Sequence, residues 1–417
     1  MTQINNDCRA SPDKTAPHSP ELADILRRHI SDYRQHYALH PEHYKVVGDI
    51  MQCRTAYLGG HMHHCSACDK ELNVYNSCRN RHCPKCQTMT KAKWLEDRKA
   101  ELLPVTYFHS VFTLPHDINP VALCNKRKVY GILFQAVSKT LLKFGRNPEN
   151  GLEGKLGVIA ILHTWNQRLE DHIHLHGVIP GGVLSFDHTA FRPCAHDFLF
   201  PVKALSKVFR GIFMELFVAA FEKGELIFPG RTECFGTKSG FKKLRKTLWS
   251  KAWVVYAKKP FDGPKDVLGY IARYTHRVAI SNHRIVACEG GKVTFNYRNR
   301  KANTIENETI DAVEFIRRFL LHAVPPNFMR IRHYGLFANR NKKANINRCR
   351  TLLGIKGDLP QRVKKSVEQL MLELTGNDIS RCPFCKKGVM KQMMTIPRFS
   401  GPGSHELLNR RAGKDSS

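Results

Sequence analysis

The spacing of apolar and polar residues along the chain predicts its order of helices and strands. Residues 21–57 carry apolar side chains at helical spacing, and residues 89–103 read as a further helix that bears several lysines and arginines. From residue 105 onward, short apolar runs typical of buried strands alternate with amphipathic stretches. The chain is therefore expected to begin with helices and to continue into a region of mixed sheet and helix.

The later elements can be placed individually. Strands are expected at 105–114, 156–165, 172–182 and 253–259, and a hairpin at 284–297 that turns at Gly290-Gly291. Helices are expected at 121–144, 203–222, 264–277 and 311–322, and a basic loop at 231–251. The short link between the second and third strands favours an antiparallel hairpin. This order predicts an α+β fold in which helices pack on an antiparallel sheet.

Composition divides the chain into four expected parts. Residues 1–20 are polar and rich in Pro, Ser, Asp and Asn, which predicts a disordered leader. Residues 21–103 combine the first helices with a Cys/His-rich segment, and residues 104–324 hold the predicted sheet. Residues 325–417 form a basic C-terminal region that ends in a polar tail.

Positive charge is the strongest signal in the composition. The 417 residues include 66 Lys and Arg against 36 Asp and Glu, a formal net charge of +30. A polyanionic partner is the commonest cause of such an excess, with nucleic acid ahead of a membrane surface. Residues 231–259 carry nine Lys or Arg against one acid, and residues 330–365 carry eleven against one, as expected for tracking a nucleic-acid backbone. No stretch approaches the roughly 20 apolar residues of a membrane helix, and no signal peptide is evident, so a cytoplasmic protein is expected.

Cysteines predict a metal site. Six of the 14 cysteines form three CxxC pairs, a pattern that indicates zinc in a reducing compartment. A structural zinc takes four ligands at tetrahedral corners, and each CxxC turn offers two thiolates. The two neighbouring pairs predict one zinc site made of Cys65, Cys68, Cys83 and Cys86. The alternates for these ligands are Cys78, His82, His61, His63 and His64. The third pair, Cys382 and Cys385, is half of a second site whose partners are not evident.

A second candidate metal site lies on a predicted strand. His172, His174 and His176 alternate with apolar residues, so the three imidazoles share one face of the strand. Neighbouring pairs have Cα atoms about 7 Å apart, which lets two rings bind one ion, whereas all three span about 13 Å. An ordinary half-exposed sheet face is the alternative interpretation. Three imidazoles side by side repel one another when protonated, which favours a metal, and the spacing leaves open which pair binds it.

Two tyrosines form the third candidate. Tyr270 and Tyr274 are four residues apart in GYIARYTHR, so on a helix both phenols lie on one face. Arg273 and Arg277 follow on the same flank, a cationic neighbourhood that argues against the simpler interpretation of two packed core aromatics. A phenol oxygen beside a bound divalent ion also has a chemical use, namely attack on phosphorus to form a phosphotyrosine ester.

With these features together, the sequence resembles the rolling-circle HUH two-tyrosine transposases, and among them the bacterial insertion sequence 91 family with its N-terminal zinc-binding domain. The resemblance is carried by SCRNRHCPKCQ (77–87), HTWNQRLEDHIHLHGVIPGG (163–182), GYIARYTHRVAISNHRI (269–285) and RHYGLFANRNK (332–342). It implies the antiparallel sheet of the replication-initiator nucleases for residues 104–324, as an HUH endonuclease domain, and a zinc-finger DNA-binding domain for residues 21–103.

The resemblance also implies roles for individual residues. The family's His-hydrophobic-His strand holds Mg²⁺ or Mn²⁺, which maps to His174 and His176. Its paired tyrosines map to Tyr270 and Tyr274. The third polar ligand is less clear, because the slot one turn after the second tyrosine holds Val278. The candidates that remain are Gln167, in the predicted hairpin loop, and His276 as its rival.

The activity implied is metal-dependent cleavage and transfer of single-stranded DNA, at transposon ends and target, through 5′-phosphotyrosine intermediates. Arg273 and Arg277 would steady the phosphate charge. The protein would then carry structural zinc and work on DNA in the bacterial nucleoid. Two other functions fit parts of the sequence. A non-catalytic zinc-finger binder of nucleic acid has no use for the His strand and the tyrosine pair together, whereas a metal-dependent phosphoesterase that uses water would leave both tyrosines merely packed.

Overall fold

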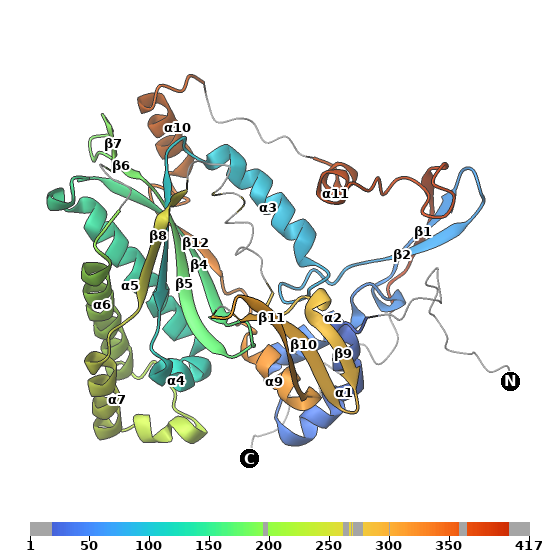
Figure 1. Ribbon diagram of the computed structural model, residues 1–417, viewed down its shortest axis with the longest axis horizontal. Helices are drawn as coiled ribbons and strands as arrows, with labels where there is room; N and C mark the ends of the chain where they lie inside the picture. The colour runs from blue at the N-terminus through green and yellow to red at the C-terminus, as the bar shows by residue number, and fades with distance from the viewer. Residues whose placement is uncertain are drawn as a thin grey trace, which may run out of the picture.

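The computed structural model describes residues 19–194, 199–261, 267, 269, 278–299, 301–357 and 365–399 (Figure 1). It is a mixed α and β structure with three antiparallel sheets, which confirms the predicted α+β class. Among these residues, no helix is both long and apolar enough to span a membrane. Short 3₁₀ turns, η1 to η5, lie at Ala56–Leu58, His116–Ile118, Pro148–Asn150, Gly230–Phe235 and Asn282–Arg284.

The N-terminal helices and a small sheet come first. The predicted helices are confirmed as α1 (Leu22–His36), α2 (Pro41–Gln52) and α3 (Gln87–Glu101). Strands β1 (Gly60–Cys65) and β2 (Glu71–Tyr75) form a hairpin between α2 and α3. The other edge of β1 pairs with β13 (Met390–Ile396), near the end of the described chain. The C-terminal region, which also holds α11 (Val367–Thr375), thus returns to the N-terminal part of the fold.

A seven-stranded sheet forms the centre of the molecule. Its strands are β3 (Tyr107–Thr113), β4 (Lys155–Trp165), β5 (Asp171–Pro180), β6 (Gly182–Leu184), β7 (Phe191–Pro193), β8 (Val255–Phe261) and β12 (Ile331–Gly335). Their order is β7-β6-β4-β5-β3-β8, and β12 pairs with β4. The expected antiparallel hairpin of β4 and β5 is confirmed. The basic C-terminal region therefore contributes a strand to this sheet through β12.

The two faces of this sheet differ. One face packs its apolar side chains, among them Leu162, Ile173 and Leu175, against helices in a single large core. These helices are α4 (Asn119–Cys124), α5 (Lys126–Arg146), α6 (Val202–Glu222) and α7 (Lys238–Ser250). Figure 1 shows α5 and α6 on this side of the sheet and α3 on the other. The intervening residues of the same strands point to the opposite face. Their side chains are apolar at one end of the strands and are histidines at the other end.

A third sheet packs on the N-terminal helices. Strands β9 (Ile285–Glu289) and β10 (Lys292–Asn299) form the predicted hairpin, with Gly290 and Gly291 at φ of 54° and 71°, where glycine is favoured. Strand β11 (Thr304–Asp311) completes this sheet, and α9 (Ala312–Leu321) follows. Apolar side chains of α1, α2, α9 and these strands share one core.

Two expectations for the middle of the chain need comment. The basic loop predicted at 231–251 is wrong, because η4 and α7 occupy most of it. Phe241, Leu244 and Leu248 bury the apolar stripe of α7, which the five cations on its other faces obscured in the sequence. The helix predicted at 264–277 lies outside the described residues except for Val267 and Gly269. The remaining described helix, α10 (Lys342–Leu352), lies over the histidine-bearing face of the central sheet.

Candidate metal centres and active site

Three histidines converge on the face of the central sheet opposite α5. His174 and His176 lie on β5, and the register of the hairpin places His163 of β4 directly opposite His174. The Nε2 atoms of His174 and His176 are 3.1 Å apart, and Nδ1 of His163 is 3.2 Å from Nε2 of His176. Imidazole nitrogens bound about 2.1 Å from one ion, at right angles to one another, lie about 3 Å apart. The three rings are therefore arranged as ligands of a single metal ion.

Hydrogen bonds to the outer nitrogens favour this arrangement. Nδ1 of His174 donates to the carbonyl oxygen of His172 at 2.6 Å, which leaves the Nε2 lone pair pointing into the cluster. Nδ1 of His176 is 2.9 Å from Nε2 of His109, on the neighbouring strand β3. Such outer contacts fix the ring tautomer of metal-bound histidines. The site lies beneath the surface, because each of its histidines is at least 92% buried: His109, His163, His174 and His176.

The third ligand differs from the residue expected. Gln167 does not reach the histidine cluster, and its backbone oxygen accepts a hydrogen bond from Arg284 at 2.5 Å in a separate cavity. The physical reason is that Gln167 lies at the tip of the β4–β5 loop, beyond the last paired residues of the hairpin. His163 takes its place. Pairing β4 with β5 residue by residue would have revealed it, since cross-strand neighbours have Cβ atoms about 5 Å apart.

The predicted tyrosines and arginines lie outside the described residues. Tyr270, Arg273, Tyr274 and Arg277 fall in this segment, as does His276. Val267, three residues before Tyr270 in the sequence, is fully buried. It packs with Ile159, Ile161 and Val178, which project from the same sheet face as the three histidines. Val267 therefore lies on the sheet face that carries the histidine cluster.

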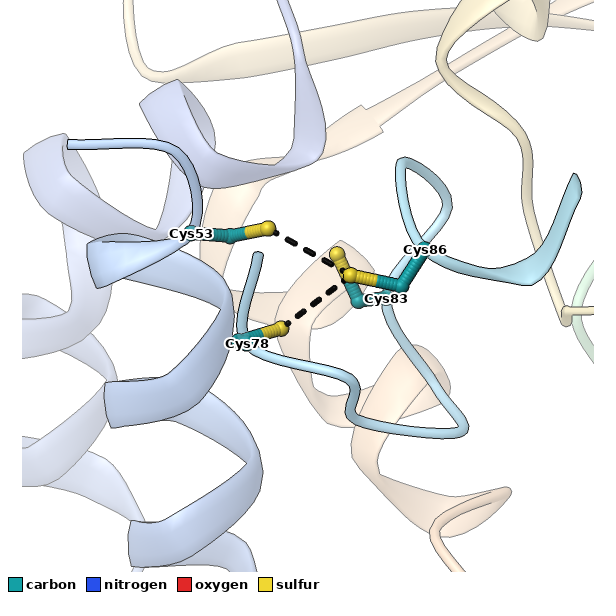
Figure 2. A group of neighbouring side chains, drawn as sticks. All are labelled: Cys53, Cys78, Cys83 and Cys86. Carbon is teal, nitrogen blue, oxygen red and sulfur yellow. Dashed lines mark hydrogen bonds between the residues drawn. The ribbon is translucent and has the colours of Figure 1, made fainter. Parts of the chain in front are cut away.

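Four cysteines form a first zinc site beside α2 (Figure 2). The sulfur of Cys86 lies 3.5 Å from that of Cys53 and 3.6 Å from that of Cys78, and Cys83 completes the group. Sulfurs bound tetrahedrally about 2.3 Å from zinc are separated by about 3.8 Å, close to these values. Hydrogen bonds from Cys78 and Cys83 lower the pKa of Cys53 to about 7, so a thiolate ligand is accessible near neutral pH.

A second zinc site joins the two ends of the described chain. Cys65 lies 3.7 Å from Cys385, and Cys68 lies 3.7 Å from Cys382, sulfur to sulfur. Backbone N–H groups of Gly388 and then Lys387 lower the pKa of Cys385 to about 6 by stabilising its thiolate. The pair that had no evident partner in the sequence thus completes a four-cysteine group.

The predicted single site of Cys65, Cys68, Cys83 and Cys86 is therefore wrong, because its two halves belong to different clusters. The reason is that the first CxxC turn lies at the tip of the β1–β2 hairpin, which carries Cys65 and Cys68 away from Cys83 and Cys86. Of the alternates, Cys78 is a member of the first cluster. His82 is buried instead, where its Nε2 accepts a hydrogen bond from the backbone of Val324 at 3.4 Å. Cys53 carries no local motif in the sequence.

Comparison with known proteins bears on both kinds of site. A family model described as "Putative transposase" matches residues 157–345, which include the three clustered histidines and the two tyrosines. A second, described as "Transposase zinc-binding domain", matches residues 25–114, which include every ligand of the first zinc site. Cys382 and Cys385 lie beyond both matches. No solved structure matches the chain.

Two curated relatives are transposases by name. The chain is 44% identical over 386 residues to "Putative transposase y4qJ" of Sinorhizobium fredii (strain NBRC 101917 / NGR234), an alignment that covers 92% of this chain and 96% of that protein. It is 23% identical over 299 residues to "Transposase for insertion sequence element IS801" of Pseudomonas savastanoi pv. phaseolicola, with 71% and 70% covered. The zinc-binding domain, the transposase domain and these relatives agree with the sequence motifs: the chain belongs to the insertion sequence 91 family of transposases.

Proposed function

We propose that this transposase cleaves and rejoins single-stranded DNA at the ends of an insertion sequence, through 5′-phosphotyrosine links, in rolling-circle transposition. Tyr270 and Tyr274 are the proposed nucleophiles. The observation that carries the proposal is the convergence of His163, His174 and His176 on the sheet face against which Val267 packs, three residues before the first tyrosine. The three histidines and Val267 therefore share one face of one sheet.

The donor set is a metal-binding one, and of the two proposed ions Mn²⁺, a transition metal, suits three imidazole nitrogens better than Mg²⁺, which prefers oxygen ligands. Three imidazole nitrogens leave coordination positions for oxygens of a substrate, in contrast to the closed four-cysteine sites. A bound ion would polarise the scissile phosphate and ease attack on it. The protein's own contribution is to hold three neutral imidazoles in place, which the carbonyl of His172 does for His174.

The tyrosines supply the covalent chemistry. The phenol oxygen of one tyrosine forms a bond to phosphorus, the bond from phosphorus to the 3′-oxygen breaks, and the proton ends on the departing 3′-hydroxyl. The energy of the phosphodiester is kept in the new ester, so rejoining requires no ATP. The second tyrosine allows another cleavage while the first link persists. Arg273 and Arg277 are proposed to steady the phosphate charge.

Denaturing gel electrophoresis of the protein with Mn²⁺ and labelled single-stranded element-end DNA tests this proposal. We expect a covalent protein–DNA adduct that survives denaturation. Replacing both tyrosines, as Tyr270→Phe with Tyr274→Phe, should abolish the adduct and the cleavage while DNA binding remains. If cleavage continues without an adduct, water is the nucleophile and the protein is a phosphoesterase.

A pair of variants on the β4–β5 hairpin tests the metal triad in the same assay. His163→Ala should abolish adduct formation, because it removes a ligand from the cluster. Gln167→Ala, four residues along, should leave it near the wild-type level, since Gln167 lies in another cavity. The reverse result would restore Gln167 as the ligand. Binding without cleavage in every preparation would instead favour a non-catalytic DNA-binding protein.

A further inference from the structure

A strongly basic groove leads to the histidine cluster. It has a volume of about 830 Å³, and its walls are α3 on one side and the segment 327–334, which includes most of β12, on the other. His163 lines this groove and is also a member of the metal-binding triad. Six arginines line it: Arg79, Arg81, Arg98, Arg127, Arg330 and Arg332. No carboxylate is among the described residues that line it.

Neutral backbone groups orient several of these arginines. Arg127 donates to the carbonyl of Pro326 at 2.6 Å, and Arg332 donates to that of Met329 at 3.3 Å. Arg330 donates to the carbonyl of Arg81 at 3.3 Å. A carbonyl oxygen fixes the direction of a guanidinium group but does not neutralise its charge. Glu101 pairs with two of the lining cations, with Arg98 at 2.9 Å and with Lys342 at 2.6 Å. The groove therefore keeps an excess of fixed positive charge, which favours an anionic ligand.

The first zinc site helps to build this wall. Arg79 and Arg81 lie in the loop between the ligands Cys78 and Cys83, so the metal fixes the backbone that carries them. Cys86 caps the N-terminus of α3, which presents Gln87, Thr90, Trp94 and Arg98 to the groove along one helical face. Trp94 adds an aromatic ring beside the cations. Planar guanidinium groups bind phosphates, and an aromatic ring among them gives bases a surface for stacking.

We propose that this groove guides one strand of DNA from the zinc-binding domain to the histidine cluster, with its phosphates held by the arginines along the walls. The assignment rests on the proposed function and names where its substrate lies. A cavity of this volume is the size of a pocket that encloses a small ligand, so it fits a short length of one strand better than the wider duplex. The end of the groove at His163 then places a phosphate beside the metal-binding triad.

The salt dependence of DNA binding tests the groove. The protein with both zinc ions is titrated into a labelled oligothymidylate of about 16 nucleotides, in buffer without other divalent cations, and anisotropy is measured over a range of salt. Each phosphate contact to a single strand contributes about −0.7 to the slope of log Kobs against log salt. Arg79→Gln with Arg127→Gln, at two exposed positions of the groove, should weaken binding about tenfold or more and reduce the slope by about 1.4.

Matched variants separate charge in the groove from charge elsewhere. Arg79→Lys with Arg127→Lys should keep the wild-type slope, because the charges remain. Lys203→Gln with Lys207→Gln, at exposed positions of α6 on the other side of the sheet from α3 (Figure 1), removes the same charge far from the groove and should leave the slope unchanged. The proposal is overturned if the groove variant binds like the wild type or if the α6 variant alone lowers the slope. It is also overturned if a duplex of equal length binds the wild type as tightly as the single strand does and loses as much affinity in the groove variant.

The binding slope and the formation of the covalent adduct report on different parts of the protein. The variant Tyr270→Phe with Tyr274→Phe should bind oligothymidylate with the wild-type slope, since the slope counts charged contacts to phosphates and this change removes no charge. Loss of adduct formation without change in the groove slope concerns the nucleophiles alone. An unchanged slope in the groove variant, combined with normal adduct formation by the wild type, rejects the groove and leaves the proposed function in place.

Discussion

His322 shows how the fold holds a buried side chain in one protonation state. The ring is 2% exposed, Nε2 donates to the carbonyl oxygen of Leu169 at 3.0 Å, and Nδ1 accepts from the hydroxyl of Thr164 at 3.3 Å. Both ring nitrogens are thus used by the neutral tautomer. Burial lowers the pKa of His322 to about 4, because water no longer stabilises the charged form.

This residue predicts a pH dependence of stability. The unfolded chain binds a proton at His322 below its ordinary pKa of about 6.5, whereas the folded chain does so only near pH 4. Its contribution is therefore complete above pH 6.5 and is lost as the pH falls towards 4, by about 3 kcal/mol. Urea unfolding at several pH values, with zinc in excess, should show that the advantage of the wild type over His322→Gln shrinks across this window.

The control for this measurement is a change at an exposed side chain that binds no proton. Gln35→Ala, on the exposed side of α1, should therefore differ from the wild type by an amount that stays flat from pH 6.5 to 4. Zinc-bound thiolates also titrate on acidification, but they do so in all three proteins and cancel in the comparison. A parallel pH response of the wild type and His322→Gln would mean that the buried ring is not what resists protonation.

At the scale of elements, Gly388 lets the second zinc site close onto the β1–β2 hairpin. A Cβ atom at this position would lie 2.4 Å from Sγ of Cys65 and 2.8 Å from Cβ of Ala67, closer than atoms can approach. Gly388→Ala should therefore displace a zinc ligand and cost about 1–3 kcal/mol of stability. A chelator titration with a colorimetric zinc indicator should show faster release of one of the two zinc ions.

A helical glycine provides the comparison. Gly48 lies in α2, and among the described residues no atom beyond its own stretch of helix lies within 4 Å of the place that a Cβ would take there. Gly48→Ala should therefore keep both zinc ions and gain about 0.5–1 kcal/mol from higher helix propensity. If Gly388→Ala released zinc no faster than the wild type, the loop around Cys385 would be able to move aside without loosening the site.

Helices and strands with a clear hydrophobic periodicity were predictable from the sequence. The pairing of strands that are distant in the sequence was not. The β4–β5 and β9–β10 hairpins were expected from apolar runs joined by short links, because a hairpin is a local structure. The pairing of β12 with β4 and of β13 with β1 joins distant segments, and nothing in a strand's own sequence names its neighbour. The missed helix α7 has a local cause, since its lysines and arginines outnumber its buried residues.

The metal sites show the same limit at the scale of the whole molecule. Three CxxC pairs indicated zinc, but their spacing does not decide which pairs share an ion, and Cys68 finds its partner Cys382 at a separation of 314 residues. Cys53 was missed because a lone cysteine after a helix carries no signal. His174 and His176 were placed correctly on one face by alternation, and His163 joined them only through the register of the hairpin.

The core shared by α1 and α9 leads to a prediction about domain boundaries. Leu22, Ile25 and Leu26 of α1 share a buried cluster with Phe315 and Phe319 of α9. A fragment of residues 104–357 therefore keeps the central sheet but exposes these phenylalanines to water. Exposing several large apolar side chains at about 1.5–3 kcal/mol each approaches the total stability of a domain. We expect this fragment to aggregate or to melt without a cooperative transition.

The comparison that makes this result specific is a fragment of residues 1–357. It lacks Cys382 and Cys385 and should bind one zinc ion instead of two, yet it retains every residue of the shared core. Thermal melting followed by circular dichroism should show a cooperative transition for 1–357 and none for 104–357, with binding of an apolar dye by the shorter fragment. Cooperative melting of 104–357 near the full-length temperature would mean that residues 21–103 form a separable DNA-binding domain. The expected outcome makes the N-terminal helices part of the fold that supports the β9–β11 sheet, so zinc binding and the histidine face belong to one cooperative unit.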